Sequence, residues 1–306
     1  MRRITLEELS RFPTLDYSFR KAPGASYPPS ASGIGYKHRT LTQFVNNIGA
    51  ASQLELWYPI VDTSTGQYHS ISQIWVEGFG GSSTLQTAET GWVVSPLHFG
   101  TNAAVPFTYW TADNFVSTGC FNLECPGFVQ LNNNLVLGAP NWSAPTQPGG
   151  QQVVINLQWQ AQQNPDGTLF GWVLYYNCTP SNYYTCYVGY IPIATYGTGQ
   201  LSVYANNVEF GGETLTSGTI SGQMGSGALP SAGPSYTAYQ SNAYYVYVTS
   251  PGHFSAENCD LGYANFPQTD SCYGEAVALP TCGSPPRFPC NSFYFGGPGG
   301  TNCPGQ

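Results

Sequence analysis

A two-residue alternation of apolar and polar side chains recurs along most of this chain, and this period constrains the fold more than any other feature. Residues 153–159 show it most clearly, with Val, Ile, Leu and Trp at the odd positions and Asn and Gln at positions 156 and 158. Alternate residues of a β-strand face opposite sides of its sheet, so the pattern predicts a strand with one buried face. The other stretches of this kind are 54–60, 68–77, 85–95, 105–111, 126–131, 168–176, 184–191, 201–210, 213–221 and 235–249.

Turn-forming residues separate these stretches. The chain holds 36 Gly and 24 Pro, without a collagen-like period and without an evident long sequence repeat. Many short strands with polar outer faces favour two packed antiparallel sheets over a propeller or a solenoid. We therefore expect an all-β fold, an antiparallel β-sandwich of two packed, curved sheets.

Charged residues are rare and unevenly placed. They make up 8% of the chain, so its polar surface must come from Ser, Thr, Asn, Gln and Tyr, which gain no charge in acid. Residues 1–39 hold seven basic and three acidic residues, a net charge of +4, whereas residues 40–306 hold one basic and 13 acidic residues, a net charge of −12. The acidic part argues against nucleic acid and anionic lipid as partners.

Composition divides the chain into three parts. Residues 1–50 form a basic N-terminal arm, in which a capping-box pattern predicts a helix over 6–12 and a Pro/Gly/Ser-rich linker follows at 22–35. Residues 51–250 carry the β pattern and form the main domain. Residues 251–306 are a Cys-, Gly- and Pro-rich tail that cannot build a large core, so disulfides must hold it.

Nine cysteines point to an oxidising compartment. The pairs Cys120/Cys125 and Cys178/Cys186 are spaced like small disulfide loops between expected strands. Zinc binding is the alternative, but no His-x3-5-His partner accompanies the Cys-x4-Cys spacing. The odd count leaves one thiol free or paired between chains, and the oligomeric state stays open.

We expect a secreted, extracellular protein without a membrane partner. No apolar run approaches the roughly 18 residues of a membrane span. The two N-terminal arginines are not followed by the apolar stretch of a signal peptide. If the protein is secreted, its signal has been removed from this sequence.

Carboxylates are the candidates for chemistry. The chain has neither a Gly-x-Ser-x-Gly turn nor a glycine-rich phosphate loop before a helix, and its four histidines are scattered, although a triad of distant residues stays open. Glu89 shares its strand face with apolar and small residues, where a buried carboxyl must be paired or protonated. Glu213 follows Gly211 and Gly212, and two glycines in a strand allow another backbone to approach closely. Periodicity alone does not pair these glutamates, and each could be an ordinary half-exposed strand residue.

Seven short motifs resemble, in the same order, the neprosin family of prolyl endopeptidases. They are Ser72-Gln-Ile-Trp-Val76, Glu89-Thr-Gly-Trp92, Phe107-Thr-Tyr-Trp-Thr-Ala-Asp113, Gly119-Cys-Phe-Asn-Leu-Glu-Cys-Pro-Gly-Phe-Val129, Gly189-Tyr-Ile-Pro192, Phe210-Gly-Gly-Glu213 and Gln223-Met-Gly-Ser-Gly227. The resemblance covers about residues 52–245. The chain departs from the family in having Phe210 where Trp is usual, an extra loop around 177–186, and a Cys-rich tail without a counterpart.

The resemblance implies a glutamic endopeptidase that cuts proline-containing peptides or proteins after proline, with Glu89 and Glu213 as the catalytic pair and with no metal or cofactor. It also implies that Cys120 and Cys125 close a disulfide loop. Five other residues of the matching motifs are candidates for supporting the pair or binding substrate: Gln73, Trp92, Tyr109, Gly211 and Gly212. For Trp92 the alternative is a place in the core, and for Gln73 an ordinary strand position.

We expect the curved sheet to form a substrate cleft in which the two glutamates meet. Two close carboxyls do not both ionise easily, so one would act on water as general base while the other donates a proton, at acid pH. The sequence does not say which is which. A glycosidase or carbohydrate-binding β-sandwich is one alternative function, and a disulfide-rich structural protein without catalysis is another.

The basic arm suggests an inhibitory pro-segment. Its Lys and Arg side chains, with Lys37 and Arg39 nearest to the main domain, would pair with cleft carboxylates until acid protonates them. A solvated, flexible N-terminus is the alternative.

Overall fold

The computed structural model describes residues 35–80, 84–133, 135–179, 181–182, 185–250, 253–258, 262–263, 270–278, 292–301 and 303. The helix predicted over 6–12 and nearly all of the predicted linker lie outside these residues. The helices in the described part are short: α3 (Pro96–Phe99) and the 3-10 helices η1 (Thr63–Thr65), η2 (Ile193–Tyr196), η3 (Gln200–Ser202) and η4 (Pro230–Ala232). In this part no helix has the length and apolar character needed to cross a membrane.

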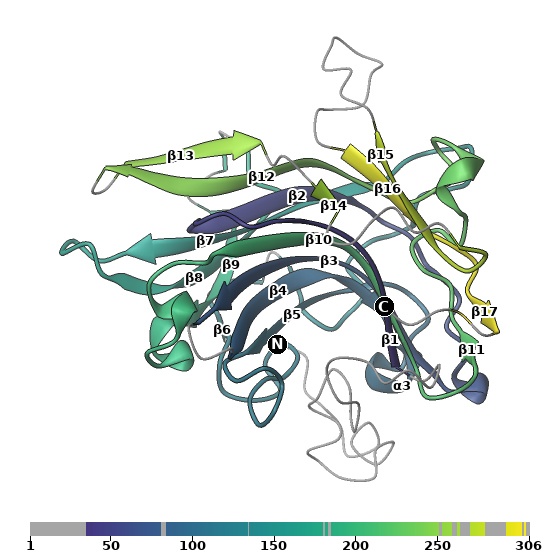
Figure 1. Ribbon diagram of the computed structural model, residues 1–306, viewed down its shortest axis with the longest axis horizontal. Coiled ribbons are helices and arrows are strands. Elements are labelled where there is room, and N and C mark those ends of the chain that lie inside the picture. Colours follow the sequence, from purple (N-terminus) through teal and green to yellow (C-terminus); the bar gives the residue numbers. More distant parts are fainter. Residues whose placement is uncertain are drawn as a thin grey trace.

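Two antiparallel sheets carry the fold, which confirms the all-β prediction (Figure 1). The first has six strands in the order β14 (Gly262–Tyr263), β1 (Gly35–Gln43), β10 (Asn207–Thr216), β3 (Gln67–Phe79), β4 (Leu85–Val94) and β5 (Val105–Thr111). The second has nine, in the order β15 (Gly274–Ala278), β16 (Ser292–Gly296), β12 (Tyr239–Ser250), β2 (Gly49–Glu55), β7 (Val154–Gln163), β8 (Leu169–Tyr176), β9 (Tyr187–Pro192) and β6 (Val129–Gln130), with β13 (His253–Asn258) also paired to β12. A two-stranded ribbon joins β11 (Ile220–Ser221) to β17 (Gly300–Thr301). Figure 1 shows β1, β10, β3, β4 and β5 curving together.

A continuous apolar core joins the facing sides of the two sheets. Trp92 and Phe210 of the six-stranded sheet are fully buried in it, as are Trp159 and Trp172 of the nine-stranded sheet. Burial of such large side chains is the main stabilising contribution in a chain with few charges. A smaller apolar cluster lies on the other side of the six-stranded sheet, over β4 and β5.

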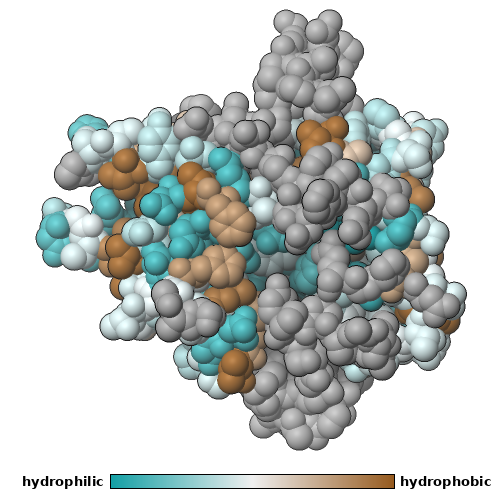
Figure 2. Space-filling view, in the orientation of Figure 1, coloured by the Kyte–Doolittle hydropathy of each residue, from teal (hydrophilic) through white to brown (hydrophobic). Residues whose placement is uncertain are grey.

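Among the residues that the structure describes, the exposed apolar side chains do not form one patch. The most exposed of them, Phe44, Ile60, Val116 and Val203, lie in four different loops. Figure 2 shows hydrophilic and hydrophobic residues interspersed on the visible face. Scattered apolar residues of this kind are normal on a protein surface and indicate no binding site.

Both ends of the described chain belong to the sheets. β1 lies in the segment that composition assigned to the arm, and it pairs with β10 from Gly35 to Gln43. The buried Arg39 of β1 donates to Asp270 at 2.6 Å and lies 3.4 Å from Glu275, so β1 is bound to the tail. The described parts of the arm and the tail are therefore integral to the fold, because removing either would expose paired strand edges and buried charge.

Disulfides reinforce the loops and the tail. The bridges predicted from spacing, Cys120–Cys125 and Cys178–Cys186, are both present, and a third joins Cys272 to Cys303. The remaining three cysteines lie outside the described residues.

Several of the predicted strand boundaries are wrong. The strand predicted over 54–60 ends as β2 at Glu55, although Leu56 and Trp57 stay buried, so burial continues the apolar pattern beyond the strand. The strands predicted over 201–210 and 213–221, divided at the glycine pair, meet in the single strand β10, which spans only Asn207–Thr216, while Gln200–Ser202 form η3 and Ile220–Ser221 form β11. The glycines do not end this strand, because β1 packs against Gly211 too closely for a side chain.

The contact between β3 and β4 predicts a strict requirement for glycine at position 91. A Cβ atom on Gly91 would collide with the carbonyl oxygen of Ser72 and lie 2.7 Å from Gln73 Cα. We expect Gly91→Ala to lower the free energy of unfolding by about 2 kcal/mol or more, measured by urea denaturation. The control is Gly80→Ala, whose Cβ would meet nothing within 4 Å and which should change stability by less than about 0.5 kcal/mol. Equal stability of the two variants would contradict the packing described for β3 and β4.

The buried carboxyl of Glu55 predicts that acid stabilises the fold. Burial raises the pKa of Glu55 from 4.5 to about 7, against a hydrogen bond of 2.9 Å from Trp57. Because the folded-state pKa lies above the unfolded one, the contribution to stability is fully present below about pH 4.5 and is lost as the pH rises through about 7. The loss amounts to about 3 kcal/mol.

Urea denaturation between pH 4 and 8 tests this contribution. The stability of Glu55→Gln relative to the wild type should rise by about 3 kcal/mol over this range. Asp166→Asn, at a fully exposed carboxyl in a turn, is the control and should show no such rise. A constant difference between Glu55→Gln and the wild type would show that Glu55 does not titrate between the two states in this way.

Candidate active site

Strand register brings Glu89, Gln73 and Glu213 onto one face of the six-stranded sheet. Gln73 of β3 lies opposite Gly91 of β4 and opposite Gly211 of β10. Glu89 comes two residues before Gly91, and Glu213 comes two residues after Gly211, so both are diagonal neighbours of Gln73 on its own face. The two glutamates therefore lie on either side of Gln73, on the face turned away from the core between the sheets.

Three nitrogen atoms surround the carboxylate of Glu213. His38 Nε2 lies 3.0 Å from Oε2, and His69 Nε2 lies 2.9 Å from Oε1. Gln73 Nε2 donates to Oε2 at 3.2 Å. Glu213 is 2% exposed, so these contacts offset the loss of water around a buried carboxyl.

Glu89 has different surroundings. It is fully buried, and it accepts a hydrogen bond of 2.8 Å from the hydroxyl of Thr87. In the sheet it lies opposite Trp75 on one side and opposite Tyr109 on the other. The Tyr196 hydroxyl donates to the Thr87 carbonyl at 2.9 Å, and burial, followed by the charge of nearby Glu89, raises the pKa of Tyr196 well above its usual value. Glu89 thus lies beside a hydroxyl group, with aromatic residues opposite it in the sheet.

A third carboxyl, that of Glu209, belongs to the same face. It comes two residues before Gly211 and lies opposite Trp75. Burial raises the pKa of Glu209, Thr40 and His38 lower it, and the charges of Glu213 and Glu89 raise it further. Both glutamates of the pair therefore act electrostatically on one side chain, which places them in a common acidic environment.

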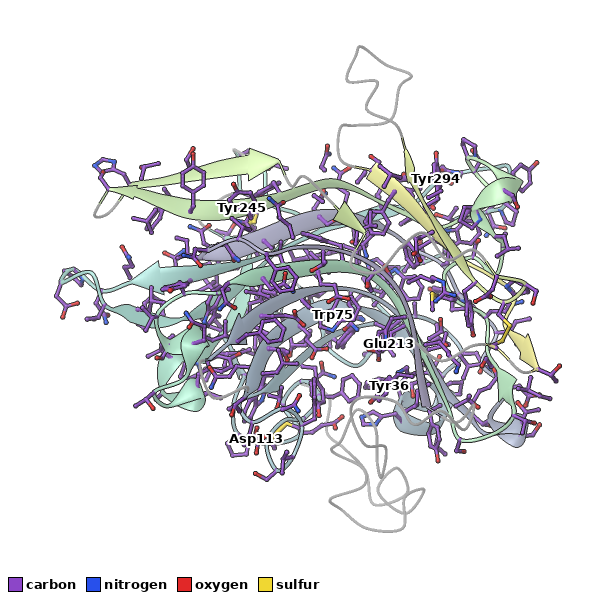
Figure 3. All side chains as sticks on the ribbon, in the orientation of Figure 1. Tyr36, Trp75, Asp113, Glu213, Tyr245 and Tyr294 are labelled. Atoms are coloured by element: carbon purple, nitrogen blue, oxygen red, sulfur yellow. A yellow bond between two sulfur atoms is a disulfide. The ribbon has the colours of Figure 1, made fainter. Side chains whose placement is uncertain are left out.

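Aromatic rings line the face beside these carboxyls. The ring of His38 stacks on Tyr36 at 5.7 Å and meets the edge of Trp75 at 6.2 Å. Figure 3 labels Tyr36, Trp75 and Glu213, which lie near one another on the arch of the sheet. Acidic groups and aromatic surface are therefore presented together.

The nine-stranded sheet supports this face from behind. Gln240 of β12 reaches across the core, and its Nε2 lies 3.1 Å from the carbonyl oxygen of Gln73 and 3.3 Å from that of Gly211. A further contact of 3.1 Å joins it to the Ser72 hydroxyl. The backbone between the two glutamates is therefore held by both sheets.

The structure divides the supporting residues that the motifs suggested. Gln73, Gly211 and Tyr109 lie on the face of the two glutamates. Trp92 and Gly212 lie on the opposite face of the sheet, which is turned toward the core. Trp92 is buried in the core, where its ring N–H donates to the Glu55 carbonyl at 2.9 Å. A Cβ on Gly212 would lie 2.5 Å from the ring of Phe295, so this glycine serves core packing.

Sequence reasoning missed His38, His69, Trp75 and Glu209. For three of them a signal existed, because counting by two from Gln73 reaches His69 and Trp75, and counting by two from Glu213 reaches Glu209. His38 carried no such signal, because its strand was assigned to the arm. Its place opposite Glu213 depends on the pairing of β1 with β10.

Lys37 and Arg39 do not pair with the candidate site. They lie opposite Thr214 and Gly212, on the face of β10 that is turned away from Glu213. Arg39 instead contacts Asp270 and the C-terminal tail. The proposed pairing of these two basic residues with cleft carboxylates is therefore wrong.

Across the part of the chain that the structure describes, no group of three or more His, Cys, Asp or Glu side chains could hold a metal ion. The contacts of His38 and His69 with Glu213 are hydrogen bonds between the side chains themselves.

Comparison with known protein families agrees with this architecture. The family model described as Neprosin matches residues 66–298. The match extends beyond the motifs seen in the sequence and includes much of the Cys-rich tail, so the tail does have a counterpart in the family. With more than two thirds of its length matched, this chain belongs to the Neprosin family.

Proposed function

We propose that this protein is a glutamic endopeptidase that hydrolyses peptide bonds after proline, with Glu89 and Glu213 as its catalytic pair. Membership of the Neprosin family implies peptide substrates. The observation that carries the proposal is the placement of both motif glutamates on one sheet face, on either side of Gln73, although they are far apart in the sequence.

Two carboxyls can complete the hydrolysis of an amide without another catalyst. The ionised glutamate takes a proton from water as the water oxygen bonds to the scissile carbonyl carbon. The protonated glutamate donates its proton to the carbonyl oxygen, which gives a gem-diol intermediate. As this intermediate collapses, the first glutamate passes the proton it took from water to the leaving nitrogen, the second takes a proton back from a diol hydroxyl, and the C–N bond breaks. One water is consumed, and both glutamates return to their starting states.

The surroundings of Glu89 suit a proline substrate. Trp75 and Tyr109 flank Glu89 in the sheet and offer aromatic surface to an apolar ring. Gly91 and Gly211 leave the backbone beside Gln73 without side chains. An extended substrate could therefore approach the sheet closely between the two glutamates.

Three disulfides fit an oxidising compartment, and secretion is part of the proposal. The proposed pro-segment is shorter than the arm of residues 1–50 that the composition indicated. β1 contributes His38 to the candidate site, so a maturing cleavage would have to precede Gly35. The basic residues that could reach the carboxylates are then those of residues 1–34.

The catalytic pair predicts the effect of two isosteric changes. Glu89→Gln and Glu213→Gln should each lower kcat by about a thousandfold or more on a proline-containing peptide, because each removes one proton-transfer group. The double variant should be little worse than either single one, since the two groups act as a unit. Initial rates of peptide cleavage, with circular dichroism to verify folding, provide the measurement.

Glu124→Gln is the matched control for these variants, because Glu124 is paired with His98 at 2.7 Å outside the candidate site. It should keep nearly normal activity. Near-normal cleavage by either catalytic-pair variant would refute the assignment. An oligosaccharide assayed in parallel separates the alternatives: its cleavage in place of the peptide would indicate a glycosidase, and cleavage of neither would favour a structural protein.

A two-carboxyl mechanism also predicts the pH dependence of activity. The proton-donating glutamate loses its proton as the pH rises, so kcat/KM should be highest in acid and fall toward neutral pH. Rates between pH 3 and 9, with each sample re-assayed at the optimum to correct for unfolding, test this. Maximal activity at alkaline pH would exclude the mechanism.

A further inference from the structure

We propose that His38 and His69 are positioning residues that hold Glu213 as a carboxylate, which makes Glu213 the general base and leaves Glu89 as the proton donor. The inference rests on the proposed function and deepens it, because it assigns the two chemical roles.

The geometry around Glu213 carries the first step. The two imidazoles contact different oxygens of the same carboxylate, His38 at Oε2 and His69 at Oε1. Gln73 adds an amide N–H to Oε2. An amide nitrogen can only donate, and an imidazole with its proton on Nε2 does the same. Donors aimed at both oxygens stabilise the ionised form of a carboxyl over its protonated form.

The sheet register shows why these side chains converge. His38 lies directly opposite Glu213 on β1, whereas His69 and Gln73 lie diagonally on β3, on either side of the position opposite Glu213. The donors therefore come from both neighbouring strands, and Glu213 is held from two sides. His69 is 3% exposed, so its imidazole has been removed from water to make this contact.

The two imidazoles are themselves held in place. The His38 ring stacks on Tyr36, which also lies 6.1 Å from the His69 ring in a tilted contact. One aromatic side chain thus packs against both histidines. Tyr36 packs against the two imidazoles, and the imidazoles contact Glu213. These side chains therefore support the carboxylate and do not themselves contact the substrate.

Glu89 is suited to the other role. Its contact with Thr87 is made by a hydroxyl, which can donate to a carboxylate or accept from a carboxylic acid. A hydroxyl accommodates a carboxyl that gains and loses a proton during each turnover.

Several titratable groups share this face and act on the pair. In the described strands they are Tyr36 and His38 on β1, Glu209 and Glu213 on β10, His69 and Glu77 on β3, Glu89 on β4 and Tyr109 on β5. Lys37 and Arg39 of β1 face the other side. Among these titratable groups of the described strands, the two histidines are the ones that can carry a positive charge, and the remaining carboxyls oppose the ionisation of Glu213. Removing either histidine should therefore make Glu213 bind a proton more readily.

The pH profile of kcat/KM tests this role. His69→Leu and His38→Leu should each move the acid limb of the profile upward by about one pH unit, because a carboxylate that loses an N–H donor is protonated more easily. They should also lower kcat about 10- to 100-fold with a smaller change in KM. His69→Gln and His38→Gln, which retain an N–H group, should recover part of both effects.

A histidine from outside the site supplies the matched control. His98 contacts Glu124 at 2.7 Å, a pair of the same chemistry and similar burial. His98→Leu should leave the acid limb within about 0.2 pH units of the wild type, the reproducibility expected where the titrating group is untouched. An unmoved acid limb in the His38 and His69 variants would overturn the proposal, as would an equal shift in His98→Leu.

Proton NMR of the four histidines keeps the proposal testable if the Leu variants fold poorly. In the wild type the ring resonances of His38 and His69 should follow the titration of Glu213 as well as their own. In Glu213→Gln this extra step should vanish from those two rings and leave His98 and His253 unchanged. Identical curves for His38 and His69 in both proteins would count against the proposal.

Three further outcomes separate this inference from the proposed function. Loss of activity with EDTA that Zn²⁺ restores would make the imidazoles metal ligands and overturn their role as hydrogen-bond donors. If Glu89→Gln and Glu213→Gln are inactive while the histidine variants keep the wild-type profile, only this inference fails. If either glutamate variant is active, the proposed function fails first.

Discussion

The register of β10, β3 and β4 is the constraint on which the candidate site and the core both depend. Alternate residues of these strands serve opposite faces, one packed into the core with Trp92 and Phe210 and the other carrying Glu89 and Glu213. A slip of one residue in any pairing would exchange the two sets. It would bury carboxylates in the core and expose tryptophan, so the same apolar burial that stabilises the sandwich also determines which side chains meet at the site.

Glycine at positions 91 and 211 makes this register possible. Each lies opposite Gln73, and a side chain at either would overlap the backbone of the neighbouring strand. Gln240, from the other sheet, then holds the carbonyl groups of Gln73 and Gly211 from the core side. The absence of side chains at these two positions therefore lets the neighbouring strands pack closely on both sides of Gln73.

Because the chain has few charged residues, its few buried ionisable groups have a large effect on its stability. The chain has 8% charged residues, yet Glu55, Glu89, Glu213 and Arg39 are almost fully buried. Glu213 and Arg39 are surrounded by complementary groups, whereas burial raises the pKa of Glu55 to about 7. Because the penalty of this buried carboxylate is lost in acid, Glu55 makes the fold more stable in acid than at neutral pH.

The sequence by itself determined the all-β class, the two short disulfide loops and the family, because strand period, cysteine spacing and motif order are local properties of the chain. It also singled out Glu89 and Glu213, through the motifs that contain them. Only the tertiary structure decided that β1 belongs to the sheet, that His38 and His69 meet Glu213, and that Trp92 and Gly212 face the core. Each of these depends on which strand pairs with which and in what register, and pairing between distant segments is selected by the burial of whole faces rather than by any short stretch of sequence.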